Sequence, residues 1–210
     1  MPASPVTYTF LGPEGTFTEA ALMQVPGAAE AIRIPSSNVN AALDKVRNGS
    51  ADAAMVPIEN SVEGGVTATL DAIATGQELR ILREALVPIS FVLVARPGVR
   101  IEDIRRISTH GHAWAQCRLW VDSHIPNVEY IPGSSTAAAA LGLLEADPHY
   151  DAAIGAPIVA AEQPGLAVLA ENIGDNPGAV TRFVLVGRPG ALPERTGADK
   201  TTVVVPLPED

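Results

Sequence analysis

The chain has 210 residues, 47% of them hydrophobic and 4% aromatic, and its 14 basic and 24 acidic side chains give a formal net charge of −10. Such a charge argues against a nucleic-acid or anionic-membrane surface, so we expect no nucleic acid and no membrane as partner. The single cysteine, Cys117, excludes an internal disulfide and favours a reducing compartment. The sequence shows neither a signal peptide nor a membrane span, and we expect a soluble, cytoplasmic protein.

The chain begins with a predicted strand, turn and helix. Residues 6–11 alternate as a strand does, residues 12–15 form a Gly/Pro turn, and Thr16 is the expected N-cap of a helix near 17–24. Free backbone N–H groups at such a helix start can face an anion. Thr16 is therefore a candidate ligand-binding residue, with plain helix capping as the alternative.

Polar residues follow the third predicted strand. A strand at 31–34 leads into a helix over 38–48, for which Ser36-Ser37 is the expected cap, and the buried strand 51–56 comes next. That strand is expected to end at Pro57-Ile58 and to be followed by Glu59, Asn60, Ser61 and Gly64. Open α/β sheets bind ligands at the carboxyl ends of their strands, which makes these residues site candidates.

The second half of the sequence repeats part of the first. Ser134-Ser135 and Ala140-Leu141 reproduce the spacing from Ser36-Ser37 to Ala42-Leu43, and residues 151–158 echo residues 52–58 with one residue added. Between the repeats we expect strands at 79–82 and 86–95, a short helix and strand over 101–107, a helix over 113–123 and a strand at 128–131. A short helix over 156–162 and a strand at 166–170 follow. The pattern predicts two similar α/β lobes with the ligand between them.

An arginine stands inside the last predicted strand. Turn residues 175–178 lead into Val180 to Gly187, which contains Thr181-Arg182-Phe183. A buried cation requires an anion, which for Arg182 is either an acidic neighbour or the ligand. On a regular strand Thr181 and Phe183 share one face and Arg182 points the other way.

The other patterns in the sequence do not predict a metal site or a nucleophile. His110 and His112 lack a third ligand at metal spacing, so we predict no metal. Cys117 is expected to be a buried small side chain rather than a nucleophile. The sequence contains no Walker loop, no Gly-x-Ser-x-Gly elbow and no His-Glu-x-x-His motif.

Taken together, the motifs resemble those of the prephenate dehydratase family. They are Gly12-Pro-Glu-Gly-Thr-Phe17-Thr-Glu19, Pro57-Ile-Glu-Asn-Ser61 with Gly64, His110 through Ala115-Gln-Cys117, Ser134-Ser-Thr136 and Thr181-Arg-Phe183. They occur in the family's order and at its spacing over residues 6–187. The chain departs from the family at Thr109-His-Gly-His112, where Ser-His-Pro-Gln is usual, and at Ala179, where Asn is usual.

The resemblance implies a fold like that of type II periplasmic binding proteins, in which two lobes with mixed, mostly parallel sheets enclose the active site. It also implies domain limits. The catalytic domain would cover residues 1–187, with lobe 1 at about 1–84 plus 171–187 and lobe 2 at about 85–170. A linker over 188–199 would precede residues 200–210 as the start of a truncated ACT regulatory domain.

The resemblance further implies a reaction without a cofactor, in which prephenate loses carbon dioxide and its ring hydroxyl to give phenylpyruvate. Thr181 is then the expected hydrogen-bond donor to the departing hydroxyl. Glu59 is a candidate general acid, provided that burial raises its pKa. The expected substrate-binding residues are Arg182, Phe183, Thr16, Asn60, Ser61, Gly64, His110, Ser135 and Thr136.

Expected partners follow from the same resemblance. They are prephenate, a second or further copies of the chain in a homodimer or homotetramer, and L-phenylalanine as allosteric inhibitor of the full-length protein only. Two alternatives remain at this point: a non-catalytic bilobed solute-binding protein, and an arogenate dehydratase.

Overall fold

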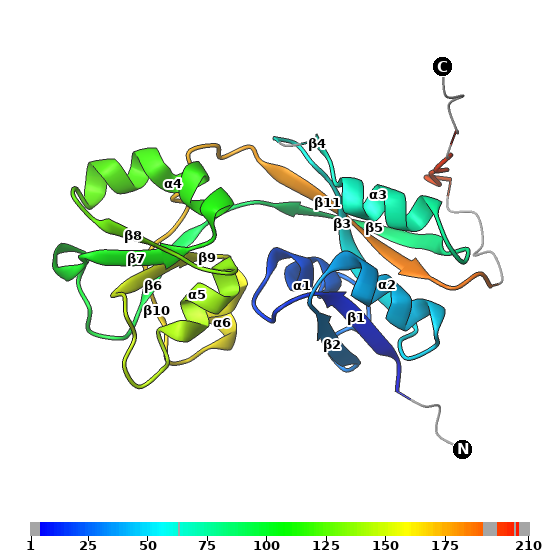
Figure 1. Ribbon diagram of the computed structural model, residues 1–210, viewed down its shortest axis with the longest axis horizontal. Coiled ribbons are helices and arrows are strands. Elements are labelled where there is room, and N and C mark those ends of the chain that lie inside the picture. Colours follow the sequence, from blue (N-terminus) through cyan, green and yellow to red (C-terminus); the bar gives the residue numbers. More distant parts are fainter. Residues whose placement is uncertain (1–4, 63, 191–196, 204, 206–210) are drawn as a thin grey trace.

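The computed structural model describes residues 5–62, 64–190, 197–203 and 205. They form two lobes that lie side by side, joined by two chain segments (Figure 1). Lobe 1 contains β1 (Thr7–Leu11), α1 (Phe17–Leu22), β2 (Ile32–Ser36), α2 (Val39–Arg47), β3 (Ala53–Asn60), β4 (Gly64–Gly65), α3 (Thr67–Ala74), β5 (Arg80–Pro88) and β11 (Val180–Gly187). Lobe 2 contains β6 (Val92–Ala95), η1 (Ile101–Asp103), β7 (Arg106–Thr109), α4 (Gly111–His124), β8 (Glu129–Pro132), α5 (Thr136–Gly142), β9 (Ala152–Gly155), α6 (Pro157–Glu162) and β10 (Ala167–Ala170).

The two sheets have the same topology. Strands run in the order β2-β1-β3-β11-β5 in lobe 1, and the order β8-β7-β9-β6-β10 in lobe 2 corresponds to it strand by strand. In each lobe the first three strands are parallel and the other two are antiparallel to their neighbours. The predicted α/β fold with two similar lobes and mixed sheets is therefore confirmed.

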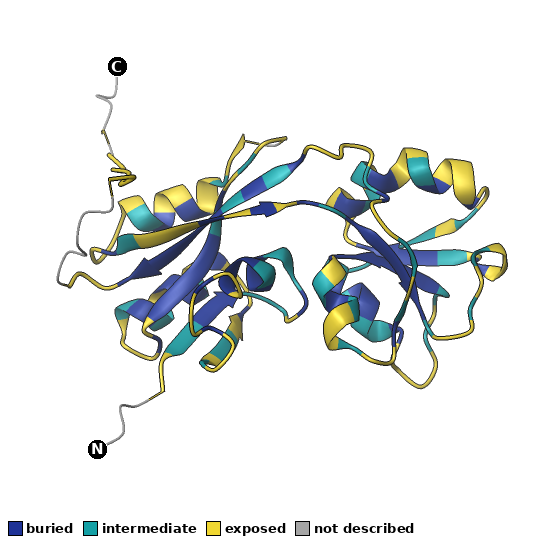
Figure 2. Cartoon of the chain, turned by 180° about the vertical axis from the view of Figure 1, so that it is seen from behind, coloured by how far each residue is buried: buried dark blue, intermediate teal, exposed yellow. Residues whose placement is uncertain are grey.

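Each sheet is covered on both faces by helices. In lobe 1, α1 packs on one face, while α2 and α3 pack on the other through Val39, Leu43 and Ala72. In lobe 2, α4 covers one face, and α5 and α6 cover the other. The buried residues accordingly concentrate on the strands, and the outer faces of the helices are exposed (Figure 2). Apolar strands with cover on both sides explain why β3, β6 and β9 are so rich in Ala, Val and Ile.

The two segments that join the lobes are hydrogen-bonded to each other. Residues 89–91 cross from β5 to β6, and residues 171–179 return from β10 to β11. Ile89 N donates to Ala179 O at 2.8 Å, and Ile173 N donates to Phe91 O at 3.0 Å. Within the returning segment, the Asp175 carboxylate accepts from the backbone N–H groups of Leu119 and Trp120 in α4, at 3.1 and 3.2 Å.

Some local predictions were wrong. Asn38, not Ser36-Ser37, caps α2, because its Oδ1 accepts from Ala41 N at 2.8 Å, whereas Ser36 is the last residue of β2. Strand β3 continues to Asn60 instead of ending at Pro57-Ile58, since antiparallel pairing with β11 extends it. The predicted strand 86–95 is divided between β5 and β6, which belong to different sheets.

The C-terminal prediction is only partly covered by the structure. Residues 200–203 have no regular secondary structure, and Lys200 Nζ donates to Glu84 Oε1 at 2.6 Å. Residues 191–196 of the predicted linker, and residues 204 and 206–210 of the predicted ACT start, lie outside the described residues.

Candidate active site

Thr181 lies near the start of β11, directly after the segment that returns from lobe 2. The residue is 6% exposed, and its Oγ1 accepts a hydrogen bond of 2.7 Å from Asn60 Nδ2. The Asn60 amide is oriented by a second bond, in which Oδ1 accepts from Val62 N at 2.8 Å. Among the described residues, no protein acceptor takes the Thr181 hydroxyl proton. The hydroxyl is therefore held by its oxygen, and its proton is available to a ligand.

A β-bulge sets the orientation of Asn60. Along β11, Arg182 pairs with Glu59 but the next residue, Phe183, pairs with Pro57, so that Ile58 is an extra residue in β3. Beyond the bulge Thr181 and Asn60 are directly paired. Directly paired residues of antiparallel strands share a face, which brings these two polar side chains together.

Arg182 and Glu59 form an ion pair on the opposite face of the same strands. Arg182 Nη2 lies 3.1 Å from Glu59 Oε2, and Nη1 lies 3.7 Å from Glu84 Oε2 on β5. Of the two alternatives for Arg182, this geometry corresponds to a pair with acidic neighbours. The burial on which the general-acid role of Glu59 depends is not found, because its side chain is 53% exposed.

The other strand residues have contacts within the protein. Ser61 binds β11 twice, because its N donates to Val180 O and its Oγ accepts from Val180 N, both at 2.9 Å. Gly64 pairs with Asn60 through the short strand β4. Phe183 is buried in the core cluster that contains α1, so the structure gives it a packing role.

The remaining predicted residues lie at helix starts. Thr16 caps α1 and Ser135 caps α5, where Oγ accepts from Ala138 N at 2.9 Å, and Thr136 is the first residue of that helix. His110 caps α4, accepting from His112 N at 3.3 Å, and the two imidazoles stack. These helix starts follow the carboxyl ends of parallel strands β1, β7 and β8.

A pocket of about 380 Å³ lies between the lobes. Its walls come from the β1–α1 and β2–α2 loops of lobe 1 and from the start of α5 in lobe 2. The lining residues are Gly12, Pro13, Pro35, Ser36, Ser37, Ser134, Ser135 and Ala138. The two Ser-Ser pairs of the internal repeat thus face the same space. Of the predicted site residues, Ser135 lines it.

Lys45 does not line this pocket but contacts Ser36, which does. Its Nζ donates to Ser36 Oγ at 2.6 Å. Sequence reasoning missed Lys45, because a lysine within a helix gives no local sign that it reaches back to the end of β2. The hydroxyls and this ammonium group suit an anionic ligand.

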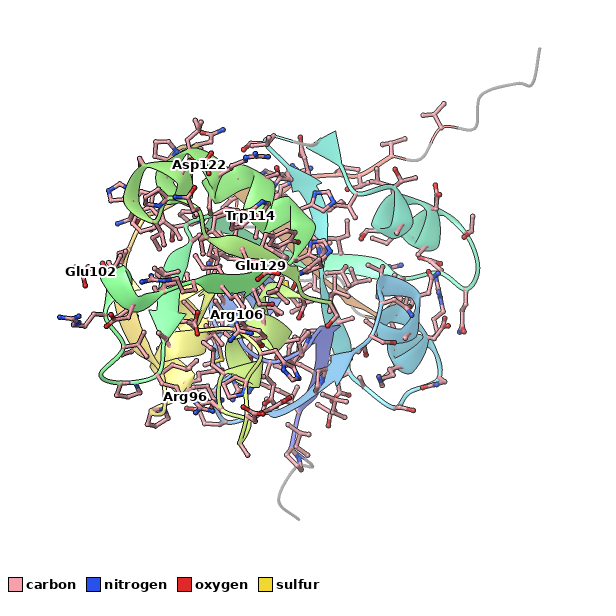
Figure 3. All side chains as sticks on the ribbon, turned by 60° about the vertical axis from the view of Figure 1, so that its left-hand side comes forward. Arg96, Glu102, Arg106, Trp114, Asp122 and Glu129 are labelled. Carbon is pink, nitrogen blue, oxygen red and sulfur yellow. The ribbon has the colours of Figure 1, made fainter. Side chains whose placement is uncertain are left out.

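In the part of the chain that the structure describes, the other titratable groups do not form a second site. Cys117 is fully buried, as expected, and burial raises the pKa of its thiol to about 12, with a smaller contribution from the Asp175 carboxylate. Within the described residues there is no group of three or more metal-ligating side chains and no helix long and apolar enough to cross a membrane. The charged residues labelled on lobe 2 in Figure 3 carry both signs, since Arg96 and Arg106 are basic and Glu102, Asp122 and Glu129 are acidic.

Comparison with known proteins places these features in a family. Residues 8–191 match the family described as prephenate dehydratase. A curated prephenate dehydratase from Mycolicibacterium vanbaalenii is 44% identical over 211 residues, an alignment that covers 94% of this chain and 67% of the relative.

Two solved structures are also similar. The prephenate dehydratase from Arthrobacter aurescens, in complex with L-Phe, is 82% identical with a TM-score of 0.86 and covers 92% of this chain and 63% of its own. GqqA, described as a quorum quenching acylase, is 28% identical with a TM-score of 0.76 and covers 90% of this chain and 66% of its own. The chain therefore spans about two thirds of the length of these relatives.

Proposed function

The chain belongs to the prephenate dehydratase family, and from this premise we propose that it converts prephenate to phenylpyruvate, water and carbon dioxide in phenylalanine biosynthesis. The chain is then a carbon–oxygen lyase that works with its own side chains and without a cofactor. Aromatisation of the ring supplies the driving force, so the protein has only to position the substrate and assist departure of the hydroxyl.

The observation that carries the proposal is the bond between Asn60 Nδ2 and Thr181 Oγ1, 2.7 Å long. Because the threonine oxygen accepts from Asn60, its proton points to another acceptor, which we assign as the leaving hydroxyl of prephenate. A neutral donor in a dry site stabilises the charge that develops on this oxygen in the transition state. Thr181 thereby assists the departure of the hydroxyl without full proton transfer.

The inter-lobe pocket and the nearby helix starts supply carboxylate recognition. Ser135 lines the pocket from lobe 2, and Lys45 lies behind Ser36 in the lobe 1 wall. A strong cationic contact with the ring carboxylate would stabilise the bound substrate more than the transition state, because this carboxylate loses its charge as it leaves as neutral carbon dioxide. We therefore assign these donors, together with Thr16, Thr136 and His110, to the pyruvyl carboxylate and its surroundings.

The test is turnover of prephenate, followed by the ultraviolet absorbance of phenylpyruvate. The wild type is expected to turn over, and Thr181→Ala should reduce kcat by about 100-fold or more, the effect of losing one transition-state donor. Thr181→Ser, which keeps the hydroxyl, is the matched control and should retain most of the rate. Equal rates for the wild type and Thr181→Ala would exclude this role for Thr181.

The same assay separates the alternatives. A solute-binding protein would bind prephenate saturably without forming phenylpyruvate. An arogenate dehydratase would show the higher kcat/KM with arogenate, which yields phenylalanine. We propose prephenate as the substrate because the curated relative carries that activity in its name.

Regulation, assembly and location are parts of the same proposal. The Arthrobacter aurescens relative was solved with L-Phe, and we propose phenylalanine as a feedback inhibitor that acts through a C-terminal ACT domain in the longer proteins. Residues 1–210 alone should keep their rate when phenylalanine is added, and a dose-dependent fall would contradict this. A cytoplasmic homodimer or homotetramer is proposed, and size-exclusion chromatography with light scattering tests the assembly.

A further inference from the structure

The β-bulge in β3 determines which face of the sheet carries Asn60. Before the bulge, Ala54, Val56 and Ile58 face α2 and α3. In a regular strand Asn60 would continue this series and point to the same side as Ile58. The extra residue at Ile58 reverses the alternation, so that Asn60 shares a face with Thr181 instead.

The bulge is held on its backbone by the start of α3. Pro57 O accepts from the buried Thr69 Oγ1 at 2.6 Å, and Ile58 O accepts from Val66 N at 2.9 Å. These two bonds satisfy the carbonyls of the bulged residues. They do not connect the bulge to β11, the strand that carries Thr181.

Arg182 makes that connection. Its guanidinium spans from Glu59, the residue that follows the bulge on β3, to Glu84 on β5, and so ties together the three strands β3, β11 and β5. Among the described residues, the buried Nε–H has no hydrogen-bond partner, so the ion pairs of Arg182 are made by its two terminal nitrogens. Glu84 also accepts from Lys200, which balances its charge from the outer side.

We propose that Arg182 is a positioning residue, which acts through Glu59 to hold the bulge and thereby keeps Asn60 aligned with Thr181. The inference rests on the proposed function and assigns Arg182 and Glu59 a joint role at that site. Without Arg182, the carboxylates of Glu59 and Glu84 lie on either side of β11 with no cation between them. Their repulsion then separates β3 from β11 at the bulge. A shift of about 1 Å in a reacting group can lower a rate about 100-fold.

The experiment compares kcat and KM for Arg182→Ala, Arg182→Lys, Glu59→Ala and the double variant, each first shown to be folded by circular dichroism and urea unfolding. Arg182→Ala should lower kcat about 10- to 100-fold and change KM less than about threefold. Arg182→Lys should be intermediate, because an ammonium group keeps the charge but cannot reach both carboxylates as a fork. The double variant should be no slower than Arg182→Ala, since both changes remove one interaction.

Binding of the product provides a readout that is independent of turnover. Phenylpyruvate, measured by calorimetry, should bind Arg182→Ala and the wild type with the same affinity. Lys200→Ala is the matched control, because it removes a charge from Glu84 without touching Arg182, and it should leave kcat unchanged.

Each other outcome would overturn the inference. A rise in KM together with weaker phenylpyruvate binding would mean that Arg182 contacts the substrate carboxylate. Multiplying effects of Arg182→Ala and Glu59→Ala would make Glu59 an independent acid. An equal loss in Lys200→Ala would indicate a general charge effect. These results differ from failure of the proposed function, in which the wild type itself does not turn over prephenate.

Discussion

Gly15, in the β1–α1 loop of lobe 1, packs against Val159 on α6 of lobe 2. The substitution Gly15→Ala tests how tightly the two lobes pack at this point. Gly15 has φ of +78°, and a Cβ atom added there would lie 2.9 Å from Val159 Cγ2 on α6. The left-handed backbone costs a residue with a Cβ about 1–2 kcal/mol. Forcing one methyl group into a packed contact costs about 1–3 kcal/mol more. We therefore expect Gly15→Ala to lower the free energy of unfolding by about 2–5 kcal/mol.

The assay is urea unfolding with linear extrapolation, and Gly27→Ala is the matched control. Gly27 has φ of +80°, and a Cβ atom added there would have no neighbour within 4 Å, so only the backbone cost applies. Val159→Ala removes Cγ2, the atom closest to the added Cβ, and the double variant should recover about 1–3 kcal/mol relative to the sum of the single changes. Equal losses in Gly15→Ala and Gly27→Ala, with additive behaviour of the double variant, would refute the argument from steric contact.

Three further predictions concern charged and titratable groups. Asp175→Asn should lower the free energy of unfolding by about 1 kcal/mol, because two backbone N–H groups of α4 lose an ionised acceptor. Guanidinium unfolding measures this loss, and an unchanged unfolding midpoint would contradict the prediction. Cys117, whose pKa is raised to about 12, should react with a disulfide reagent at pH 8 only after unfolding, so prompt labelling of the native chain would be contrary evidence. Burial and the nearby Glu19 raise the pKa of Glu162, so its contribution to stability is present below the unfolded value of 4.5 and is lost as pH rises through the folded pKa. Glu162→Gln should therefore stabilise the chain at pH 7 but not at pH 4, and thermal melts at both values provide the check.

Much of the fold could be predicted from local patterns. Alternation and helical spacing located most elements, and the Ser-Ser echo indicated two similar lobes, which the matching strand orders confirm. The echo succeeded because it reflects a repeated unit of strand, helix and strand. It did not identify the α2 cap, since Asn38 competes with two serines for the same position and sequence alone does not rank them.

Contacts between distant strands could not be predicted. Neither the extra residue at Ile58 nor the position of Glu84 opposite Arg182 has a local signal, because both depend on the register of β11 between β3 and β5. The alternation argument was sufficient to place Thr181 and Arg182 on opposite faces. It could not show that Asn60 contacts Thr181 and that Glu59 contacts Arg182.

The placement of β11 has a consequence for how the chain acquires its structure. Lobe 2 is formed by one uninterrupted stretch, residues 92–170, whereas the lobe 1 sheet needs residues 180–187 between β3 and β5. During synthesis, therefore, the second lobe can assemble while the first still lacks its fourth strand. The strand that completes the first sheet also carries Thr181, so the lobe 1 sheet and the hydroxyl of Thr181 take their native positions in the same step.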